Sequence, residues 1–267
     1  MSVALAAAAN PNSAHITLLQ VAGSLALVAI AIAVSFWRSA EVEQDMAVAV
    51  VRSFVQLTAV GYVIKGIFDS NSLWLVVALL TFMVVFGAWT ARARAKAVPR
   101  AFVPLLLALG TAAAVTLGLV IVLNVFDPKP RFMVPVGGMV IGNAMTSASV
   151  ALNRLADEIH DQAGLIEATL ALGATARQAT TRVVARGLRS GLIPLIDQTK
   201  TTGVVFFPGT MVGALLGGAS PLTAVRLQLI LLWTLMGAAA LSGMIATTLA
   251  QGRFFTAAQQ LKDPPPP

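Results

Sequence analysis

Long apolar runs separated by short polar turns make up most of the chain. A helix needs roughly 20 predominantly apolar residues to cross the hydrocarbon core of a bilayer. Runs of about this length occupy 16–37, 47–68, 72–90, 102–125, 132–151, 199–217 and 222–250. They are continuous stretches of Leu, Val, Ala and Ile rather than alternating segments of about ten residues, so a β-barrel is a poor alternative. The pattern predicts an all-α polytopic membrane protein with about seven transmembrane helices, organised as a single transmembrane domain over 1–267.

The composition leads to the same class. Of the 267 residues, 57% are hydrophobic and 11% are charged, and the mean hydropathy is +0.84. A soluble domain of this size could not bury so much apolar surface. The chain contains no cysteine, which excludes disulfides and thiolate metal ligands.

The basic residues are distributed unevenly between alternate turns. With the amino terminus outside, the turns and ends on the inside carry Arg38, Arg92, Arg94, Lys96, Arg100, Arg154, Arg177, Arg182, Arg186, Arg189, Arg253 and Lys262. The outside turns carry Lys65, Lys129 and Arg131. This asymmetry predicts an outside amino terminus and a cytoplasmic carboxyl terminus. We therefore interpret the net charge of +7 as a consequence of topology and lipid contact rather than of nucleic-acid binding.

The fifth run is unusually rich in small and polar residues. Glycines and alanines that permit close helix approach are Gly137, Gly138, Gly142, Ala144 and Ala148. Hydrogen-bonding side chains at membrane depth are Asn143, Thr146, Ser147 and Ser149. Two interpretations remain open, a role in a transport path and helix packing alone, and we favour the path. Met139, Asn143 and Met145 are the path candidates in this run, together with Gln56 and Met211 elsewhere.

Two further runs contain polar or helix-breaking residues. Arg52 and Gln56 are four residues apart in the second run and therefore share a helix face. Pro208 and Gly209 in the sixth run should break or kink that span and form a hinge. Asp197 and Lys200, three residues apart just before it, can pair.

The polar stretch 154–189 is predicted to be a cytoplasmic helical loop. Its apolar residues recur at helical spacing, and Gly164 should separate two helices. The second helix is expected to be short, with Glu167 in its first turn and Gly173 as its C-terminal stop. A solvated basic loop without a partner is the alternative.

The sequence lacks the motifs of several classes of enzyme, and this limits the functions that the chain can have. No Gly-x-x-x-x-Gly-Lys-[Ser/Thr] loop occurs, so the chain is not expected to hydrolyse ATP itself. His15 and His160 fall in different predicted compartments, and the few carboxylates lie mostly in loops, so an enzyme is not expected. Met139, Met145 and Met211 could contact a passing metal ion weakly, but nine methionines are ordinary in such a chain, and metal ligands stay unassigned.

Several motifs together resemble the FetB-type permeases of bacterial ABC transporters. They are Arg52-Ser-Phe-Val-Gln-Leu57, Gly138-Met-Val-Ile-Gly-Asn-Ala-Met145, Leu170-Ala-Leu-Gly-Ala-Thr175 and Pro208-Gly209. The resemblance covers about residues 16–255. It implies a multi-pass permease of the bacterial inner membrane that pairs with a separate ATPase, where ATP and Mg²⁺ would bind. The bacterial members are associated with iron export and metal resistance, and plant relatives with aluminium tolerance.

The resemblance also implies the coupling residues. A Glu-Ala pair with a Gly six residues after the Glu is the pattern that many transporter subunits place in the helix that docks into the ATPase. The matching residues here are Glu167, Ala168, Leu172, Gly173 and Ala174. Two departures are notable: Thr210 stands where the family usually has a second Met beside Met211, and the Ile-x-Leu-Pro ending of importer subunits is missing.

The sequence therefore suggests the membrane subunit of an ABC transporter that exports iron or another metal. A homodimer is expected, because a symmetric pair of ATPases would close on two coupling helices. The alternatives are an ATP-independent secondary transporter or channel, and a membrane scaffold that transports nothing.

Overall fold

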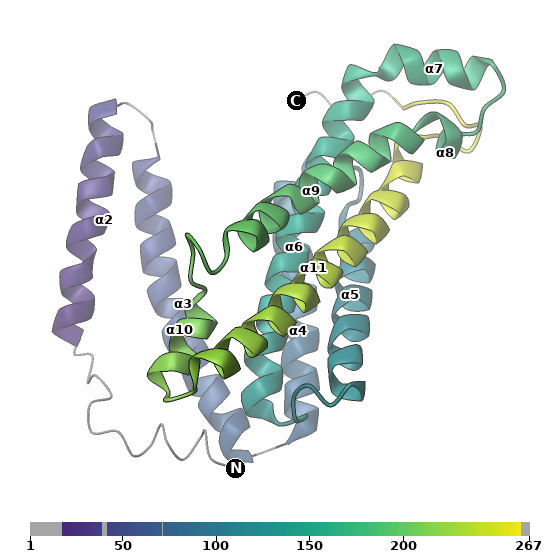
Figure 1. The fold of residues 1–267 in the computed structure, drawn as a ribbon. Coiled ribbons are helices and arrows are strands. Elements are labelled where there is room, and N and C mark those ends of the chain that lie inside the picture. The colour runs from purple at the N-terminus through teal and green to yellow at the C-terminus, as the bar shows by residue number, and fades with distance from the viewer. Residues whose placement is uncertain (1–17, 39–41, 71, 263–267) are drawn as a thin grey trace. The chain divides into compact units, whose positions relative to one another are not determined.

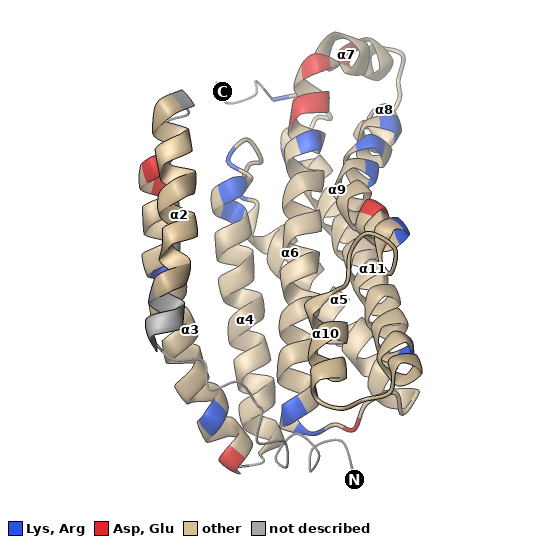
Figure 2. Cartoon of the chain, turned by 60° about the vertical axis from the view of Figure 1, so that its left-hand side comes forward, with Lys and Arg blue, Asp and Glu red and all other residues tan. Residues whose placement is uncertain are grey.

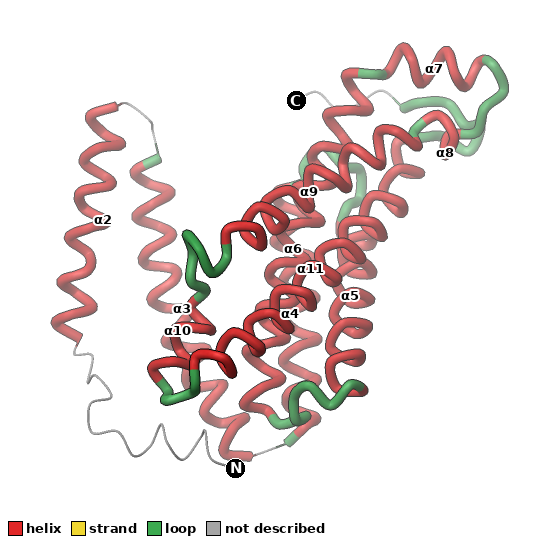
Figure 3. The backbone as a smooth tube through the Cα atoms, viewed as in Figure 1, coloured by secondary structure: helices red, strands yellow, loops and turns green. Residues whose placement is uncertain are grey.

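The computed structural model describes residues 18–38, 42–70 and 72–262, and it is dominated by helices (Figures 1 and 3). The helices are α2 (Leu18–Arg38), α3 (Glu43–Ser70), α4 (Leu73–Arg94), α5 (Phe102–Val122), α6 (Pro130–Asp161), α7 (Ala163–Ala171), α8 (Ala176–Ala179), α9 (Thr181–Thr201), α10 (Gly209–Leu216) and α11 (Pro221–Gln251), followed by the 3-10 turn η1 (Gly252–Phe254). The predicted all-α polytopic class is confirmed. His15 lies outside the described residues.

Within the described ranges, five helices are long and apolar enough to cross a membrane: α3, α4, α5, α6 and α11. Helix α2 adds a shorter apolar stretch, Gly23–Trp37, at the position of the first predicted span. These elements match six of the predicted runs in position. The count of seven membrane-spanning helices is not confirmed, because the run at 199–217 is not one helix.

The sixth run is interrupted, which corrects the prediction of a single span at 199–217. Helix α9 ends at Thr201, and α10 is eight residues long, about 12 Å, which is too short to cross a bilayer alone. Between them, Gly203 has a φ of 88° and its N–H donates to the carbonyl of Phe206 over 2.8 Å. This tight turn needs the conformational freedom of glycine, and Pro208 cannot donate to a continuing helix. The break therefore spans 202–208, with Pro208 and Gly209 at its end.

The described chain forms two compact units. The first contains α2 and α3 with the turn at 216–219. Its two helices are joined by a hydrogen bond in which the Ser35 hydroxyl donates to the Glu43 carboxylate over 2.8 Å. Arg52 and Gln56 both lie on α3, and most of the side chains of this helix are exposed.

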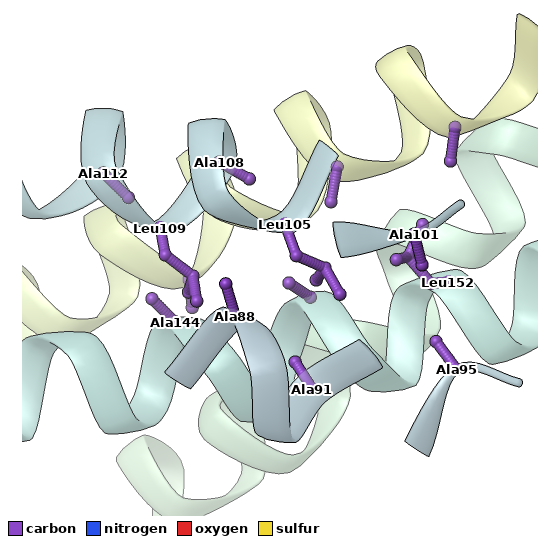
Figure 4. Close-up of a cluster of buried hydrophobic side chains, with 14 of the residues drawn as sticks. Ala88, Ala91, Ala95, Ala101, Leu105, Ala108, Leu109, Ala112, Ala144 and Leu152 are labelled. Atoms are coloured by element: carbon purple, nitrogen blue, oxygen red, sulfur yellow. The ribbon is translucent and has the colours of Figure 1, made fainter. Parts of the chain in front are cut away.

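The second unit contains 71–215 and 220–267, and its core lies between α4, α5, α6 and α11. Figure 4 shows how small and large side chains alternate in this core: Ala88 and Ala91 on α4 point toward α5, where Leu105 and Leu109 lie between the two helices. Small side chains allow membrane helices to approach closely and gain dispersion contacts. The core of this unit is therefore a close-packed helix bundle.

Helix α6 is longer than a bilayer requires. Its 32 residues extend over about 48 Å, against a hydrocarbon core of roughly 30 Å. The excess lies at its C-terminal end, which carries α7 away from the bundle (Figure 1). The fifth predicted span and the first part of the predicted loop at 154–189 thus form one continuous helix.

Candidate functional site

The most distinctive feature of the second unit is α7, which lies at the end of α6 and projects beyond the bundle (Figure 1). Ile166 is buried and anchors the helix against its neighbours. Leu165 and Leu172 point outward, with 65% and 89% of their surface exposed. Exposed apolar side chains on a segment outside the bundle make this surface a candidate for contact with another protein.

The five residues predicted to form the coupling contact all lie in this short segment. Glu167 and Ala168 are exposed in the middle of α7, Leu172 and Gly173 are exposed just after its end, and Ala174 is half-buried. The structure therefore brings all of them together on one projecting element. Their contact with another protein remains a prediction.

Two local details of this segment differ from the sequence-based expectations. The helix break lies at Gln162 rather than at Gly164, because Gln162 leaves helical geometry with φ −109° and ψ 20°. Helix α7 consequently begins at Ala163, and Glu167 is its fifth residue rather than part of its first turn. The carboxylate of Glu167 is thus displaced from the N-terminal end of the helix dipole.

The C-terminal end of α7 agrees with the prediction. Gly173 has a φ of 88°, and its N–H donates to the carbonyl of Leu170 over 2.9 Å. Thr175 then caps α8 reciprocally with Gln178, each side chain bonding to the other residue's backbone N–H. A glycine stop followed directly by a capping box fixes the direction of the chain between α7 and α8.

A buried carboxylate ties the base of α7 to α9. Glu158 on α6 is 3% exposed, and it accepts hydrogen bonds from Arg154 over 2.6 Å and from Arg186 over 2.8 Å. The Gln162 amide also donates to this carboxylate. Two guanidinium groups thus compensate one desolvated negative charge, as a buried carboxylate requires. Because Arg186 is on α9, this cluster fixes the end of α6 that carries α7.

The segment after α11 folds back against the projecting end. The backbone N–H of Ala176 donates to the side-chain carbonyl of Gln259 over 2.7 Å, and the Thr180 hydroxyl donates to Gln251 over 3.1 Å. A pocket of about 500 Å³ lies between the two segments, and its lining includes Glu167, Leu170 and Leu261. The C-terminal segment therefore shares one surface with α7.

The five path candidates do not form one cluster. Met139 and Asn143 lie one turn apart on α6 and are half-buried, and the Asn143 amide donates to the carbonyl of Met139 over 2.9 Å. Met145 lies on another face of α6, next to Gly87 of α4. A Cβ atom built on Gly87 would lie 3.8 Å from the sulfur of Met145. Gln56 belongs to α3 in the first unit. The structure thus keeps only Met139 and Asn143 as a local pair.

Met211 lies in a separate, smaller pocket. It is buried at the start of α10 and lines a cavity of about 170 Å³ together with Pro135, Arg131 and Gln228. The neighbouring Thr210, which replaces a methionine of the family pattern, donates its hydroxyl hydrogen to Gln228. A guanidinium in the wall disfavours a free cation there. Among the described residues, no group of three or more His, Cys, Asp or Glu could hold a metal ion.

Comparison with known proteins identifies the family of this chain. The model of UPF0014, described as an uncharacterised protein family, matches residues 18–255. The chain belongs to the UPF0014 family. It is 42% identical over 247 residues to the UPF0014 membrane protein STAR2 of rice, covering 92% of this chain and 86% of the relative. It is also 42% identical over 242 residues to Protein ALUMINUM SENSITIVE 3 of Arabidopsis thaliana, covering 90% and 88%.

Bacterial members of UPF0014 match over a similar length. The probable iron export permease protein FetB of Escherichia coli K12 is 33% identical over 250 residues, covering 94% of this chain and 96% of the relative. UPF0014 is thus the family of FetB-type permeases, as the sequence motifs suggested. No solved structure matches the chain.

Sequence reasoning missed the residues that hold α7 and α8 in place in this UPF0014 protein. The spacing of Arg154, Glu158 and Gln162 by four residues could have indicated contacts along one helix face. Nothing local indicates that Arg186 completes the cluster, or that Gln259 binds α8 from 83 residues away.

Proposed function

We propose that this protein is the membrane subunit of an ATP-driven exporter, and that α7 docks into a separate ATPase subunit. The proposal includes multi-pass insertion in a bacterial inner membrane, with the α7 end cytoplasmic and the amino terminus outside. ATP and Mg²⁺ would bind to the partner, because this chain contains no recognisable nucleotide-binding loop.

The exposure of Leu172 at the end of α7 is the main support for docking to an ATPase. A leucine side chain that is 89% exposed on a projecting segment gains free energy when a partner covers it, roughly 1.5–3 kcal/mol for full burial. Three features support a load-transmitting role for the segment: the Gly173 stop, the Thr175 cap and the Glu158 cluster on the α6 helix that carries it. Movement of α7 would reach the core directly through α6.

We further propose a homodimer that transports iron or another metal ion outward. The choice of a metal as substrate rests on the names of the E. coli relative and of the Arabidopsis relative, since the described residues supply no cation cage. The break at 202–208 would act as the hinge, and Met139 with Asn143 would line the path. A weak, incomplete ligand set suits a transported ion, which must be released.

Co-purification tests the proposal. The tagged chain would be isolated from its native membrane in mild detergent, and the partners quantified by mass spectrometry. We expect a P-loop ATPase at equal stoichiometry, retained by the wild type and lost from Leu172→Asp. Ala97→Asp adds the same charge to an exposed residue in the α4–α5 turn and should retain the ATPase. A chain that transports metal without any ATPase would instead indicate a secondary transporter.

A further inference from the structure

An unassigned basic pocket lies where the α4–α5 turn meets the ends of both helices. Its volume is about 690 Å³, and its lining includes Trp89, Arg92, Lys96, Arg100, Phe102 and Val103. Figure 2 shows Lys and Arg gathered at this end of α4. All residues that line the pocket lie within 89–103, and none of them is a candidate for the ATPase contact or for the transport path.

No acidic side chain among the residues that the structure describes pairs with the cations of this pocket. The sequence contains no Asp or Glu between Asp69 and Asp127, so neither α4 nor α5 supplies a counter-charge. The ion pairs of the described residues involve other side chains, and Arg92, Lys96 and Arg100 are all exposed. Three cations that line one pocket without an acidic partner are suited to a bound anion.

The turn that carries these cations is anchored to the core by buried side chains. Ala95, Val98 and Ala101 are each at most 4% exposed and pack into the core of the second unit. Arg100 adopts a φ of 51°, which reverses the chain so that α5 begins at Phe102. The cations are therefore presented by a buried framework rather than by a free loop. The positive end of the α5 dipole adds to the same potential.

The apolar part of the lining indicates the source of the anion. Trp89 is 63% exposed and Val103 is 47% exposed, and both lie at ends of helices that continue into the membrane. Tryptophan is enriched at the level of the lipid headgroups. A soluble phosphate would leave these side chains uncovered, whereas a phospholipid would place its phosphate on the cations and its acyl chains along α4 and α5.

We propose that this pocket binds the phosphate of an anionic phospholipid. The recognised chemistry is a phosphate diester with a negatively charged or uncharged remainder, because a choline headgroup would bring a fourth cation beside Arg92, Lys96 and Arg100. Basic pockets at the ends of membrane helices bind anionic headgroups in this way, and each nearby Lys or Arg contributes about fivefold in affinity.

The test uses the full chain in neutral detergent, with lipid binding followed by native mass spectrometry. We expect phosphatidylglycerol to be retained in preference to phosphatidylcholine, and the preference to fall about fivefold for each cation removed in the series Arg92→Gln, Lys96→Gln and Arg100→Gln. The control Arg177→Gln, Arg182→Gln, Arg189→Gln removes three exposed charges at α8 and α9 and should keep the preference. Equal losses in both triple variants would overturn the site.

A second measurement needs no charge substitution. Lipids brominated near the headgroup quench nearby tryptophans, and subtraction of a Trp89→Phe variant isolates the signal of Trp89. Stronger quenching by brominated phosphatidylglycerol than by brominated phosphatidylcholine supports the proposal, and equal quenching overturns it. Inorganic phosphate, compared with chloride at equal ionic strength, distinguishes the sources. Displacement of bound lipid by phosphate supports recognition of the phosphate group, whereas phosphate binding without lipid retention overturns the lipid assignment.

Discussion

Ser147 on α6 donates its hydroxyl hydrogen towards the backbone carbonyl of Gly191 on α9, with 2.9 Å between the two oxygens. The same hydroxyl lies 3.3 Å from the carbonyl of Ala239 on α11. One side chain therefore holds three helix backbones together. This approach requires a glycine, because a Cβ at position 191 would lie 2.5 Å from the carbonyl oxygen of Ser147.

Gly191→Ala is consequently expected to destabilise the second unit. The added methyl group must push α9 away from α6, which costs about 1–3 kcal/mol. Thermal unfolding of the purified protein in detergent would measure the loss as a lower Tm. Gly118→Ala is the matched control, because a Cβ there would meet no atom within 4 Å. Equal Tm values for the two variants would contradict the close packing described for α6 and α9.

Glu158→Gln is expected to weaken the connection between α6 and α9. The substitution keeps the shape of the side chain but removes the negative charge that Arg154 and Arg186 share. Because both arginines are about half exposed, solvent screening limits the loss to about 1–2 kcal/mol. The adjacent control Asp157→Asn removes an exposed carboxylate and should change the free energy of unfolding by less than about 0.5 kcal/mol. A stability equal to that of the control would show that the cluster is not important.

Local signals in the sequence predicted much of this architecture. Apolar runs located the long helices, and Gly173 marked the end of α7, because hydropathy and positive-φ glycines act over a few residues. Pro208 and Gly209 indicated a break in the sixth run, but the run was still taken as one span because it is apolar on average, whereas its conformation depends on the turn at Gly203. The mean hydropathy of a run of residues does not reveal a single residue with an unusual φ.

The connections between distant segments could not be predicted from the sequence. The contact between Glu158 and Arg186 spans 28 residues, and that between Ala176 and Gln259 spans 83. Both pairs depend on how α6, α9 and α11 pack, which depends on the whole core. Likewise, the sequence grouped Met139, Asn143 and Met145 as path candidates, but Met145 lies against Gly87 of α4, and that contact depends on where α4 packs.

Gly173→Ala should impair coupling more than Gly164→Ala. A Cβ at either position would meet no atom within 4 Å, so the two variants differ only in backbone conformation. Gly173 has a φ of 88°, where an alanine costs roughly 1–2 kcal/mol, whereas Gly164 lies in the first turn of α7. We expect Gly173→Ala to reduce retention of the ATPase and metal transport, without loss of membrane insertion. Equal activity of both variants would exclude a role for this turn in coupling.

Gln259→Ala should loosen the C-terminal segment from α8. The substitution removes the acceptor of the Ala176 N–H, a hydrogen bond with a net contribution of about 0.5–1.5 kcal/mol. Amide hydrogen exchange at Ala176 should therefore become about 2- to 10-fold faster. Gln260→Ala is the control, because the bonds of Gln260 to Thr256 use its backbone. Unchanged exchange at Ala176 would mean that the segment is held by its apolar contacts alone.

Substitutions on α6 can separate a transport path from helix packing. Met139 and Asn143 share a face, and no atom would lie within 4 Å of a Cβ on the neighbouring Gly142, whereas Met145 packs against Gly87. If the first face lines the path, Met139→Leu and Asn143→Ala should each slow ATP-driven movement of ferrous iron into inside-out vesicles by roughly fivefold, because each removes one weak polar contact to the ion. Met145→Leu conserves volume in the core and should leave both the rate and the Tm nearly unchanged. Equal rates in all three variants would instead favour packing as the role of the fifth run, since leucine replaces methionine in a packed site at little cost.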